Sequence, residues 1–232
     1  MSTNLLIDII LSIANDLLFD LMPEMIHPAC KSYQVGIGCG KVVLEVSHTI
    51  VDMKSDGYVG WKSDLSKYFD TVPIRFIDAA FDKVEAKYGH SVLIDVLRKY
   101  YHCGLYFDEN NELHEKYQSL KQGCAVASWL ANVLLYSLDD ELSQLNWVLT
   151  VKVVRMICCS LVRTMKGYDH LQRDWPKTMN LNPKKVEYLT MDKWFKFLGF
   201  SIKGSMISFS PNRLKTFQKE IESRTIRNVV LR

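Results

Sequence analysis

The sequence predicts an α+β fold with a largely antiparallel sheet. Apolar residues recur at helical spacing in several segments, whereas other segments are short β-branched runs bounded by turn residues. These helices and strands do not alternate regularly, as a parallel sheet would require. The 232 residues are 48% hydrophobic and 24% charged. This composition is typical of a soluble globular protein and excludes a disordered or repeat-array chain.

The N-terminal segment predicts a helix that packs on the core. Asp8, Asn15 and Asp16 interrupt the apolar run from Leu5 to Leu18, and no basic segment precedes it. We therefore interpret it as neither a signal peptide nor a membrane span. Four apolar residues recur at helical spacing and are expected to face the core. They are Leu6, Ile10, Ile13 and Leu17.

The segment that follows predicts a loop, one strand and three helices. A glycine-rich loop from Pro28 to Lys41 precedes a helix expected over Val42–Met53. The alternating residues from Tyr58 to Leu65 predict a strand. Pro73 suits the first turn of the next helix, in which apolar residues recur at steps of three and four. A further helix is expected from Ser91 to Tyr101.

The rest of the chain is predicted to be richer in strands. A mostly apolar helix is expected over Ala125–Leu145, a weak helix over Tyr168–Met179 that Pro176 would break, and a final helix from Pro211. β-Branched and aromatic runs that flank short polar turns predict two hairpins and a third group of strands. The expected strands are Leu105–Phe107, Leu113–Tyr117, Trp147–Val154, Ile157–Val162, Val186–Thr190, Phe195–Ile202 and Met206–Phe209.

Cysteine spacing and charge exclude several simple functions. The six cysteines form no Cys-x-x-Cys pair, and no histidine pair has zinc-binding spacing, so a structural metal is not expected. We expect reduced thiols and a cytoplasmic location. The net charge of +3 is too small to argue for nucleic-acid binding by itself. A phosphate-binding P-loop is excluded at Gly36–Lys41, because Val35 and Val42 occupy positions that need Gly and Ser or Thr.

Two segments carry candidate functional residues at the ends of predicted elements. Asp64 ends a strand and Phe69 follows it. A carboxylate there can hold a divalent ion and a ring beyond it can press on a sugar, although a solvated aspartate before a turn is the alternative. Gln122 and Gly123, followed by small residues, allow another chain to approach closely, although a buried helix explains small residues equally well.

A third segment carries two lysines, Lys184 and Lys185, in a predicted turn before a strand. Their positions suit phosphate contacts, although exposed loop lysines are common. In joint order and spacing these segments resemble the palm of reverse transcriptases, specifically bacterial enzymes of the group II intron, retron and antiviral types. Lys62–Asp70 resembles motif A of this family, and Gln122–Asn132 resembles motif B. Leu181–Lys185 resembles motif D, and Phe197–Phe200 resembles motif E. Ser32–Gly38 is similar to the family's template-contacting segment.

The resemblance implies a right-hand polymerase palm. Partial fingers would occupy residues 1–57, the palm residues 58–209, and a palm–thumb connection, the start of a thumb, residues 210–232. The implied activity is RNA-directed DNA synthesis with magnesium, an RNA template, a DNA primer or structured RNA, and deoxynucleotide triphosphates, without a membrane. The implied settings are retroelement mobility or phage defence in the cytoplasm.

The resemblance also implies roles for the candidate residues. Asp64 would be a catalytic, metal-binding carboxylate, and Phe69 would exclude a ribose 2′-hydroxyl. Gln122 and Gly123 would line the nucleotide and template pocket. Lys185, or its neighbour Lys184, would be the basic residue near the incoming triphosphate.

One motif departs from the family pattern. Reverse transcriptases carry Tyr-x-Asp-Asp on the turn of a β-hairpin between motifs B and D, so the residues that match its two aspartates are expected at the tip of that hairpin. Here Met156 replaces the tyrosine, and Cys158 and Cys159 replace both aspartates. Magnesium prefers oxygen ligands, whereas thiols suit softer metals. We therefore expect a catalytically impaired or truncated protein with little or no polymerisation.

Two alternatives remain open. The chain is a non-catalytic nucleic-acid-binding or maturase-like protein, or it is a decayed fragment without activity. The segment Pro211–Arg232 has an excess of four positive charges, which could follow a phosphate backbone. Asp139 and Asp140 are not expected to replace the lost aspartates, because they lie far along the helix after motif B and would form a solvated or pairing face.

Overall fold

The computed structural model describes most of the chain. The described residues are 5–53, 59–64, 67–107, 110, 112–115, 118–121, 123–144, 148–154, 157–162, 187–190 and 192–230. The helices are α1 (Leu5–Leu21), η1 (Pro23–Met25), α2 (Cys39–Met53), α3 (Tyr68–Thr71), α4 (Ile74–Tyr88), α5 (Val92–His102), α6 (Val126–Val133), α7 (Tyr136–Gln144) and α9 (Pro211–Val230). The strands are β1 (Val59–Asp64), β2 (Leu105–Phe107), β3 (Leu113–Glu115), β4 (Val148–Val154), β5 (Ile157–Val162), β6 (Glu187–Thr190), β7 (Phe195–Phe197), β8 (Phe200–Lys203) and β9 (Met206–Phe209).

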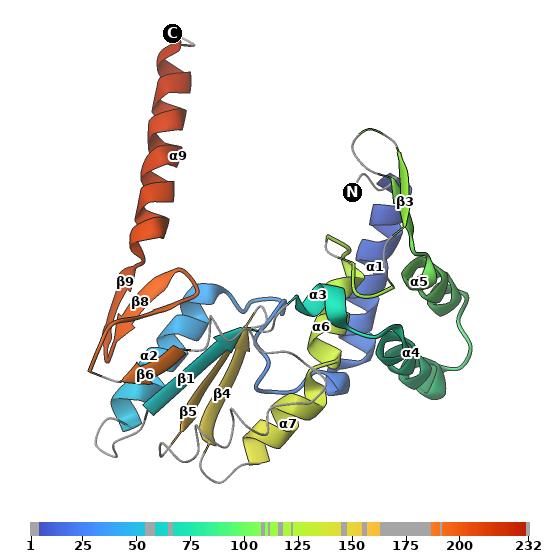
Figure 1. Ribbon diagram of the computed structural model, residues 1–232, viewed down its shortest axis with the longest axis horizontal. Helices are drawn as coiled ribbons and strands as arrows, with labels where there is room; N and C mark the ends of the chain where they lie inside the picture. The colour runs from blue at the N-terminus through green and yellow to red at the C-terminus, as the bar shows by residue number, and fades with distance from the viewer. Residues whose placement is uncertain are drawn as a thin grey trace.

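The strands form a central antiparallel sheet and two smaller sheets (Figure 1). The central sheet has the order β4-β5-β1-β6, and every neighbouring pair in it is antiparallel. β7, β8 and β9 form a second sheet, and β2 and β3 form a hairpin. The predicted α+β class with a largely antiparallel sheet is therefore confirmed. β1 is an interior strand, so both of its edges are hydrogen-bonded.

A helical core fills one end of the molecule. The helices α1, α4, α5 and α6 bury their apolar faces against one another. Its largest fully buried side chains are Trp129, Tyr101, Phe81 and Ile77. In α4 the buried residues follow the predicted steps of three and four, because such spacing places side chains on one face of a helix.

A second core lies between α2 and the strands near the C-terminus. Val42, Val46 and Ile50 of α2 are buried against Leu189 and Phe197. The Ser47 hydroxyl, in the middle of this apolar helix face, donates a hydrogen bond of 2.7 Å to the Gly204 carbonyl in the β8–β9 turn. This bond satisfies a polar group that burial would otherwise leave unpaired.

The buried face of α1 differs from the prediction. Leu11, Ala14 and Leu18 are buried in the helical core. The residues predicted to face the core are instead exposed to between 36% and 63%: Leu6, Ile10, Ile13 and Leu17. α1 is apolar on more than one face, so its spacing alone could not indicate which face meets α6.

Two predicted elements are interrupted. The helix expected over Ala125–Leu145 is divided into α6 and α7, because Leu135 N–H bonds the Asn132 carbonyl, three residues back, and the helix tightens there. The strand expected over Phe195–Ile202 turns at Leu198 and Gly199, whose φ values are 50° and 80°. These left-handed values end β7 and begin β8.

α9 begins at a side-chain cap and then leaves the body of the protein (Figure 1). The Ser210 hydroxyl accepts a hydrogen bond of 3.4 Å from Arg213 N–H, an interaction typical of a helix N-terminus. Among the helices that the structure describes, none combines the length and the apolar character needed to cross a bilayer. The helix expected over Tyr168–Met179 lies outside the described residues.

Two phenylalanines of α4 provide a test of the helical core. Phe81 is completely buried, whereas Phe76 is 39% exposed. We expect Phe81→Ala to lower the free energy of unfolding by about 3–5 kcal/mol, because it removes a buried ring and leaves a cavity. Phe76→Ala is the control and should lower the free energy of unfolding by no more than about 1 kcal/mol. Urea unfolding followed by circular dichroism measures both, and equal losses would contradict this packing.

Candidate functional site

The strand that ends in Asp64 lies beside the strand that carries the two adjacent cysteines. In the β1–β5 register Asp64 is opposite Ile157, Ser63 is opposite Cys158, and Lys62 is opposite Cys159. The predicted adjacency of these strands is therefore confirmed at the level of the backbone. The expected catalytic role of Asp64 stays a prediction.

The cysteines lie within β5 rather than at the tip of the hairpin. The last pair of the β4–β5 ladder is Val154 with Ile157, so Cys158 follows this pair and is opposite Val153. The expectation that the two thiols form the hairpin tip is corrected accordingly, because the ladder already includes both residues. Met156 lies outside the described residues.

The opposite edge of β1 is held by an ion pair. Lys62 Nζ bonds the Glu187 carboxylate of β6 and donates a second hydrogen bond of 2.8 Å to the Lys196 carbonyl of β7. The Lys62 side chain is only 16% exposed. This lysine connects the central sheet to the β7–β9 sheet and is not available to a ligand.

The segment after β1 is anchored to α6. Lys67 adopts a left-handed conformation with φ 48° and precedes the short helix α3. Tyr68 is buried, and its hydroxyl donates a hydrogen bond of 3.2 Å to the Ala131 carbonyl. Phe69 is half-buried, with its ring 5.9 Å from the Tyr68 ring in an edge-on arrangement. Phe69 therefore lies on a segment that the Tyr68 hydrogen bond attaches to α6, and its expected contact with a sugar stays a prediction.

A buried serine joins this segment to the loop before α6. The Ser119 hydroxyl lies 2.9 Å from the Phe69 carbonyl and 2.8 Å from the Val72 carbonyl. Gly123 follows in this loop with φ 84°, a value that favours glycine, and a side chain there would meet open space. The exposed backbone at Gly123 suits the predicted close approach of another chain, while its role stays a prediction. Gln122, Lys184 and Lys185 lie outside the described residues.

A buried amide ties α6 to the loop after α1. Asn132 is 2% exposed, and its Nδ2 donates a hydrogen bond of 2.8 Å to the Ser32 carbonyl. The sequence placed Asn132 at the end of the motif B segment but assigned it no role. An asparagine within an otherwise apolar helix is the signal that points to such a bond.

Asp139 is completely buried, which corrects the expectation of a solvated face. Among the described residues, neither carboxylate oxygen of Asp139 has a hydrogen-bond partner. Burial raises the pKa of Asp139 to about 7. Burial also raises the pKa of the neighbouring Cys30 to about 11, and the charge of Asp139 adds to that shift. Asp140 fits the expected pairing role, since its Oδ1 lies 3.9 Å from His27 Nε2.

One group of side chains in the described part of the chain has metal-ligand geometry. His90 at the α4–α5 turn lies 3.3 Å from both the Glu85 and the Asp95 carboxylates. However, Arg98 Nη2 is 3.0 Å from the other Glu85 oxygen. A guanidinium so close repels a divalent ion, and we interpret the group as a surface ion-pair cluster.

A comparison with protein families gives one match. The model of the family described as reverse transcriptase (RNA-dependent DNA polymerase) matches residues 6–202. A comparison with curated proteins gives no significant match to the sequence.

Solved structures show the same fold at low sequence identity. Apo telomerase from Candida tropicalis is 9% identical with a TM-score of 0.60, and the match covers 88% of this chain and 40% of that one. Telomerase from Candida albicans, in complex with a TWJ fragment of telomeric RNA, is 12% identical with a TM-score of 0.56, covering 87% and 37%. The BmCPV RNA-dependent RNA polymerase is 11% identical with a TM-score of 0.54, covering 88% and 20%. The fold is therefore polymerase-palm-like, and the chain spans less than half the length of these structures.

Asp139 predicts a specific pH dependence of stability. Its folded-state pKa of about 7 lies above the ordinary value of 3.8. The folded state therefore binds more protons than the unfolded state between these values, and stability falls as pH rises from about 4 to 7. Asp139→Asn removes the charge. We therefore expect the free energy of unfolding of the variant to exceed that of the wild type by roughly 2–4 kcal/mol at pH 8 but by much less at pH 4.5.

Urea unfolding at both pH values measures this difference. Asp140→Asn is the matched control, because Asp140 is the adjacent residue and its side chain is 47% exposed. It should change stability little at either pH. If Asp139→Asn changes the free energy of unfolding by the same amount at pH 4.5 and pH 8, the pKa of Asp139 is not raised by burial.

Proposed function

Because the chain belongs to the reverse transcriptase (RNA-dependent DNA polymerase) family, we propose that it is a catalytically impaired member of that family. The observation that carries this proposal is the pair Cys158–Cys159, which would occupy the motif C positions and lies on the strand paired with the one that ends in Asp64. In this proposal residues 1–57 are partial fingers, residues 58–209 the palm and residues 210–232 the connection to a thumb.

The proposed donor set does not fit a pair of magnesium ions. Enzymes of this family use divalent metal ions, and magnesium strongly prefers oxygen ligands. Here Asp64 is the one carboxylate in the set, whereas Cys158 and Cys159 offer sulfur, which suits softer metals. A neutral thiol also lacks the charge that would offset two dications. We therefore assign no metal-dependent step to this site.

In this proposal the protein retains the residues that are expected to bind nucleic acid and nucleotide. Phe69 and Gly123 retain the expected residue types, on two segments that the Ser119 hydrogen bond joins, and Tyr68 attaches the first of them to α6. With Gln122, Lys184 and Lys185 they would contact an RNA template, a primer or structured RNA, and a nucleotide. The likeness to bacterial group II intron, retron and antiviral enzymes extends the proposal to a cytoplasmic role in retroelements or phage defence.

A second candidate function is a non-catalytic, maturase-like RNA-binding protein. The observation that favours it is the basic character of α9, where Arg213, Lys215 and Lys219 precede two acidic residues and two further arginines follow. A basic helix next to the palm can follow a phosphate backbone without any catalysis.

Restoring the motif C carboxylates tests the proposed defect. In primer extension on an RNA template with magnesium or manganese, we expect no incorporation above background by the wild-type chain. Cys158→Asp combined with Cys159→Asp should raise incorporation on the order of 100-fold, because it returns hard oxygen donors beside Asp64. Adding Asp64→Ala to that double variant is the control and should abolish the gain. Robust wild-type incorporation that Asp64→Ala removes would refute the proposed impairment.

Filter binding to a primer–template distinguishes the binding protein from a decayed fragment. We expect binding whose logarithmic affinity falls steeply with the logarithm of salt concentration, since basic residues displace counterions from phosphates. Lys215→Ala with Lys219→Ala should reduce that slope by about 2 if both lysines contact phosphates. Absence of binding at low salt would favour the decayed fragment.

A further inference from the structure

Ser119 joins the segment that carries Phe69 to the loop that carries Gly123. Ser119 is buried, and its hydroxyl lies 2.9 Å from the Phe69 carbonyl and 2.8 Å from the Val72 carbonyl. Gly123 follows four residues later in the sequence. The proposed function places Phe69 against a sugar and Gly123 against an approaching chain. One hydroxyl thus connects the two segments on which those contacts would depend.

Pro73 explains why these two carbonyls need a donor from another segment. In a helix the N–H of residue 73 would bond the carbonyl of Phe69, four residues back, but proline has no N–H. The N–H of Phe76, which is four residues after Val72, bonds the Pro73 carbonyl instead. Both carbonyls therefore lack the helical donor four residues ahead of them. Because a buried carbonyl without a donor is costly, the Ser119 hydroxyl holds the end of α3 in place.

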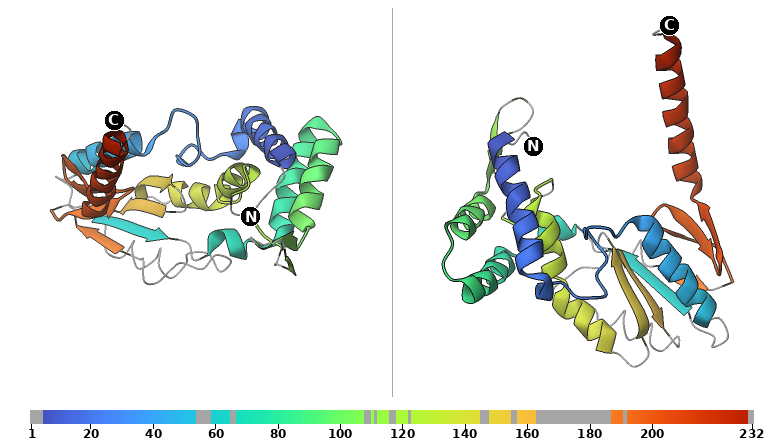
Figure 2. Two further views of the ribbon diagram at one scale, coloured as in Figure 1. Left: turned by 90° about the horizontal axis from the view of Figure 1, so that it is seen from above. Right: turned by 180° about the vertical axis from the view of Figure 1, so that it is seen from behind.

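The start of the same segment is fixed by a second buried bond. The Tyr68 hydroxyl donates a hydrogen bond of 3.2 Å to the Ala131 carbonyl of α6. α3 has only four residues, so Phe69 lies between this bond and the bond of Ser119. In all views α3 lies between the central sheet and the helices α4 and α5 (Figures 1 and 2). The backbone that carries the Phe69 ring is therefore held at both ends.

The loop that carries Ser119 is attached to α5 as well. Gln118 Nε2 donates a hydrogen bond of 2.6 Å to the His102 carbonyl. Lys121 Nζ donates one of 2.5 Å to the Tyr100 carbonyl and lies 4.3 Å from the centre of that ring. The last carbonyls of a helix have no donor within the helix, and a cation is favourable at that end. The loop is therefore held by α5 on one side and by α3 on the other.

Gly123 lies at the exposed corner of the turn that follows this loop. The N–H of Cys124 bonds the Lys121 carbonyl at 3.2 Å and closes the turn. Gly123 is the third residue of the turn and has φ 84°, a left-handed value that such turns reserve for glycine. A side chain at Gly123 would meet open space. The backbone there is open to a ligand, and the anchored residues before it determine its position.

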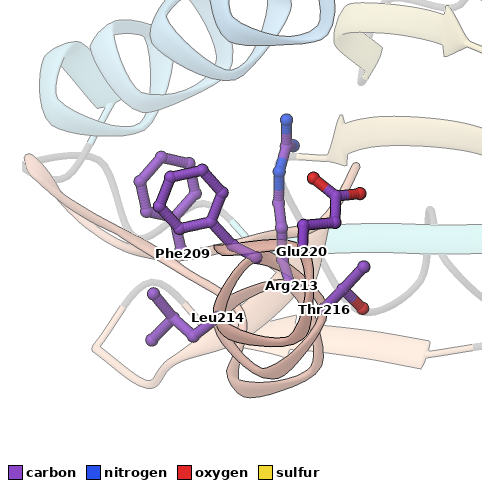
Figure 3. Close-up of a pocket in the computed structure, with 6 residues that line it drawn as sticks. Phe209, Arg213, Leu214, Thr216 and Glu220 are labelled. Atoms are coloured by element: carbon purple, nitrogen blue, oxygen red, sulfur yellow. The ribbon is translucent and has the colours of Figure 1, made fainter. Parts of the chain in front are cut away.

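The groove at the root of α9 shows no comparable arrangement. Its volume is about 420 Å³, and Arg213 and Glu220 extend beside it in the same direction (Figure 3). Their opposite charges favour no single class of ligand. Thr216 also lines the groove, and its hydroxyl donates a hydrogen bond of 3.1 Å to the Asn212 carbonyl of the same helix. Removing this hydroxyl leaves α3 unchanged, so Thr216 provides an exposed control.

We propose that Ser119 is a positioning residue of the nucleotide site, whose hydroxyl sets the place of the Phe69 ring relative to Gly123 and thereby makes the site select deoxynucleotides over ribonucleotides. This role rests on the proposed function, in which Phe69 contacts the sugar. Ser119 itself touches no substrate. A displacement of about 1 Å in a positioned group can change its effect on the order of 100-fold, so a small shift of the ring is enough to weaken selection.

Hydrogen exchange of the free, full-length chain tests the positioning. Ser119→Ala should speed the exchange of the amides at residues 69–72 about 10-fold, because the end of α3 loses its donor. Ser47→Ala is the matched control, since Ser47 is also buried and its hydroxyl bonds the Gly204 carbonyl in the second core. That variant and Thr216→Ala should leave residues 69–72 unchanged. Unchanged exchange in Ser119→Ala, or equal acceleration in Ser47→Ala, overturns the proposal.

Two further variants separate the hydroxyl from the space that it fills. Ser119→Thr keeps a hydroxyl and should retain slow exchange at residues 69–72. Ser119→Cys fills a similar space but offers only a weak donor, so it should resemble Ser119→Ala. If Ser119→Cys resembles the wild type, the packing of the side chain and not its hydrogen bond holds α3, and the proposal is wrong.

Nucleotide binding tests the selection. The full-length chain is combined with an RNA template and a DNA primer that ends in a dideoxynucleotide, so that no incorporation can occur. Competition binding then compares the complementary deoxynucleoside and ribonucleoside triphosphates. We expect the wild type, Ser119→Thr and Ser47→Ala to prefer the deoxynucleotide, and Ser119→Ala to lose about 10-fold of that preference.

The outcomes distinguish the role of Ser119 from the proposed function. A wild type and a Ser119→Ala variant with the same preference for the deoxynucleotide contradict the role of Ser119 and leave the proposed function standing. A wild type that binds neither nucleotide contradicts both.

Discussion

The antiparallel pairing of β1 with β5 and β6 is the constraint on which the rest of the structure depends. It makes β1 an interior strand, so the backbone of Asp64 is fixed relative to the two cysteines of β5. A one-residue slip would move every side chain of β1 to the opposite face of the sheet. The Lys62–Glu187 pair and the second bond of Lys62 to the β7 backbone connect this strand to the neighbouring sheet.

Around this sheet, buried hydrogen bonds hold the segments that the family resemblance connects with substrate. Ser119, Tyr68 and Asn132 each bond a backbone carbonyl at least 47 residues away in the sequence. Such bonds are costly to break once buried, because the carbonyl would remain unpaired. In the proposed function this framework would support binding, whereas Cys158 and Cys159 would supply no oxygen donors for metal chemistry. The sheet itself depends on backbone pairing and not on carboxylates at these positions.

The sequence by itself determined the α+β class and the order of nearly all elements, because these follow from periodicity, which is a local property. The position of Cys158 and Cys159 beside the strand of Asp64 followed from the resemblance of the ordered motifs to those of reverse transcriptases. Only the tertiary structure decided which face of α1 is buried, where the long apolar helix breaks at Leu135, and that Asp139 lies in the interior. Periodicity shows which residues share a face, but a helix with two apolar faces does not specify which one meets a neighbour. The burial of Asp139 depends in the same way on packing between segments distant in sequence, which no local pattern encodes.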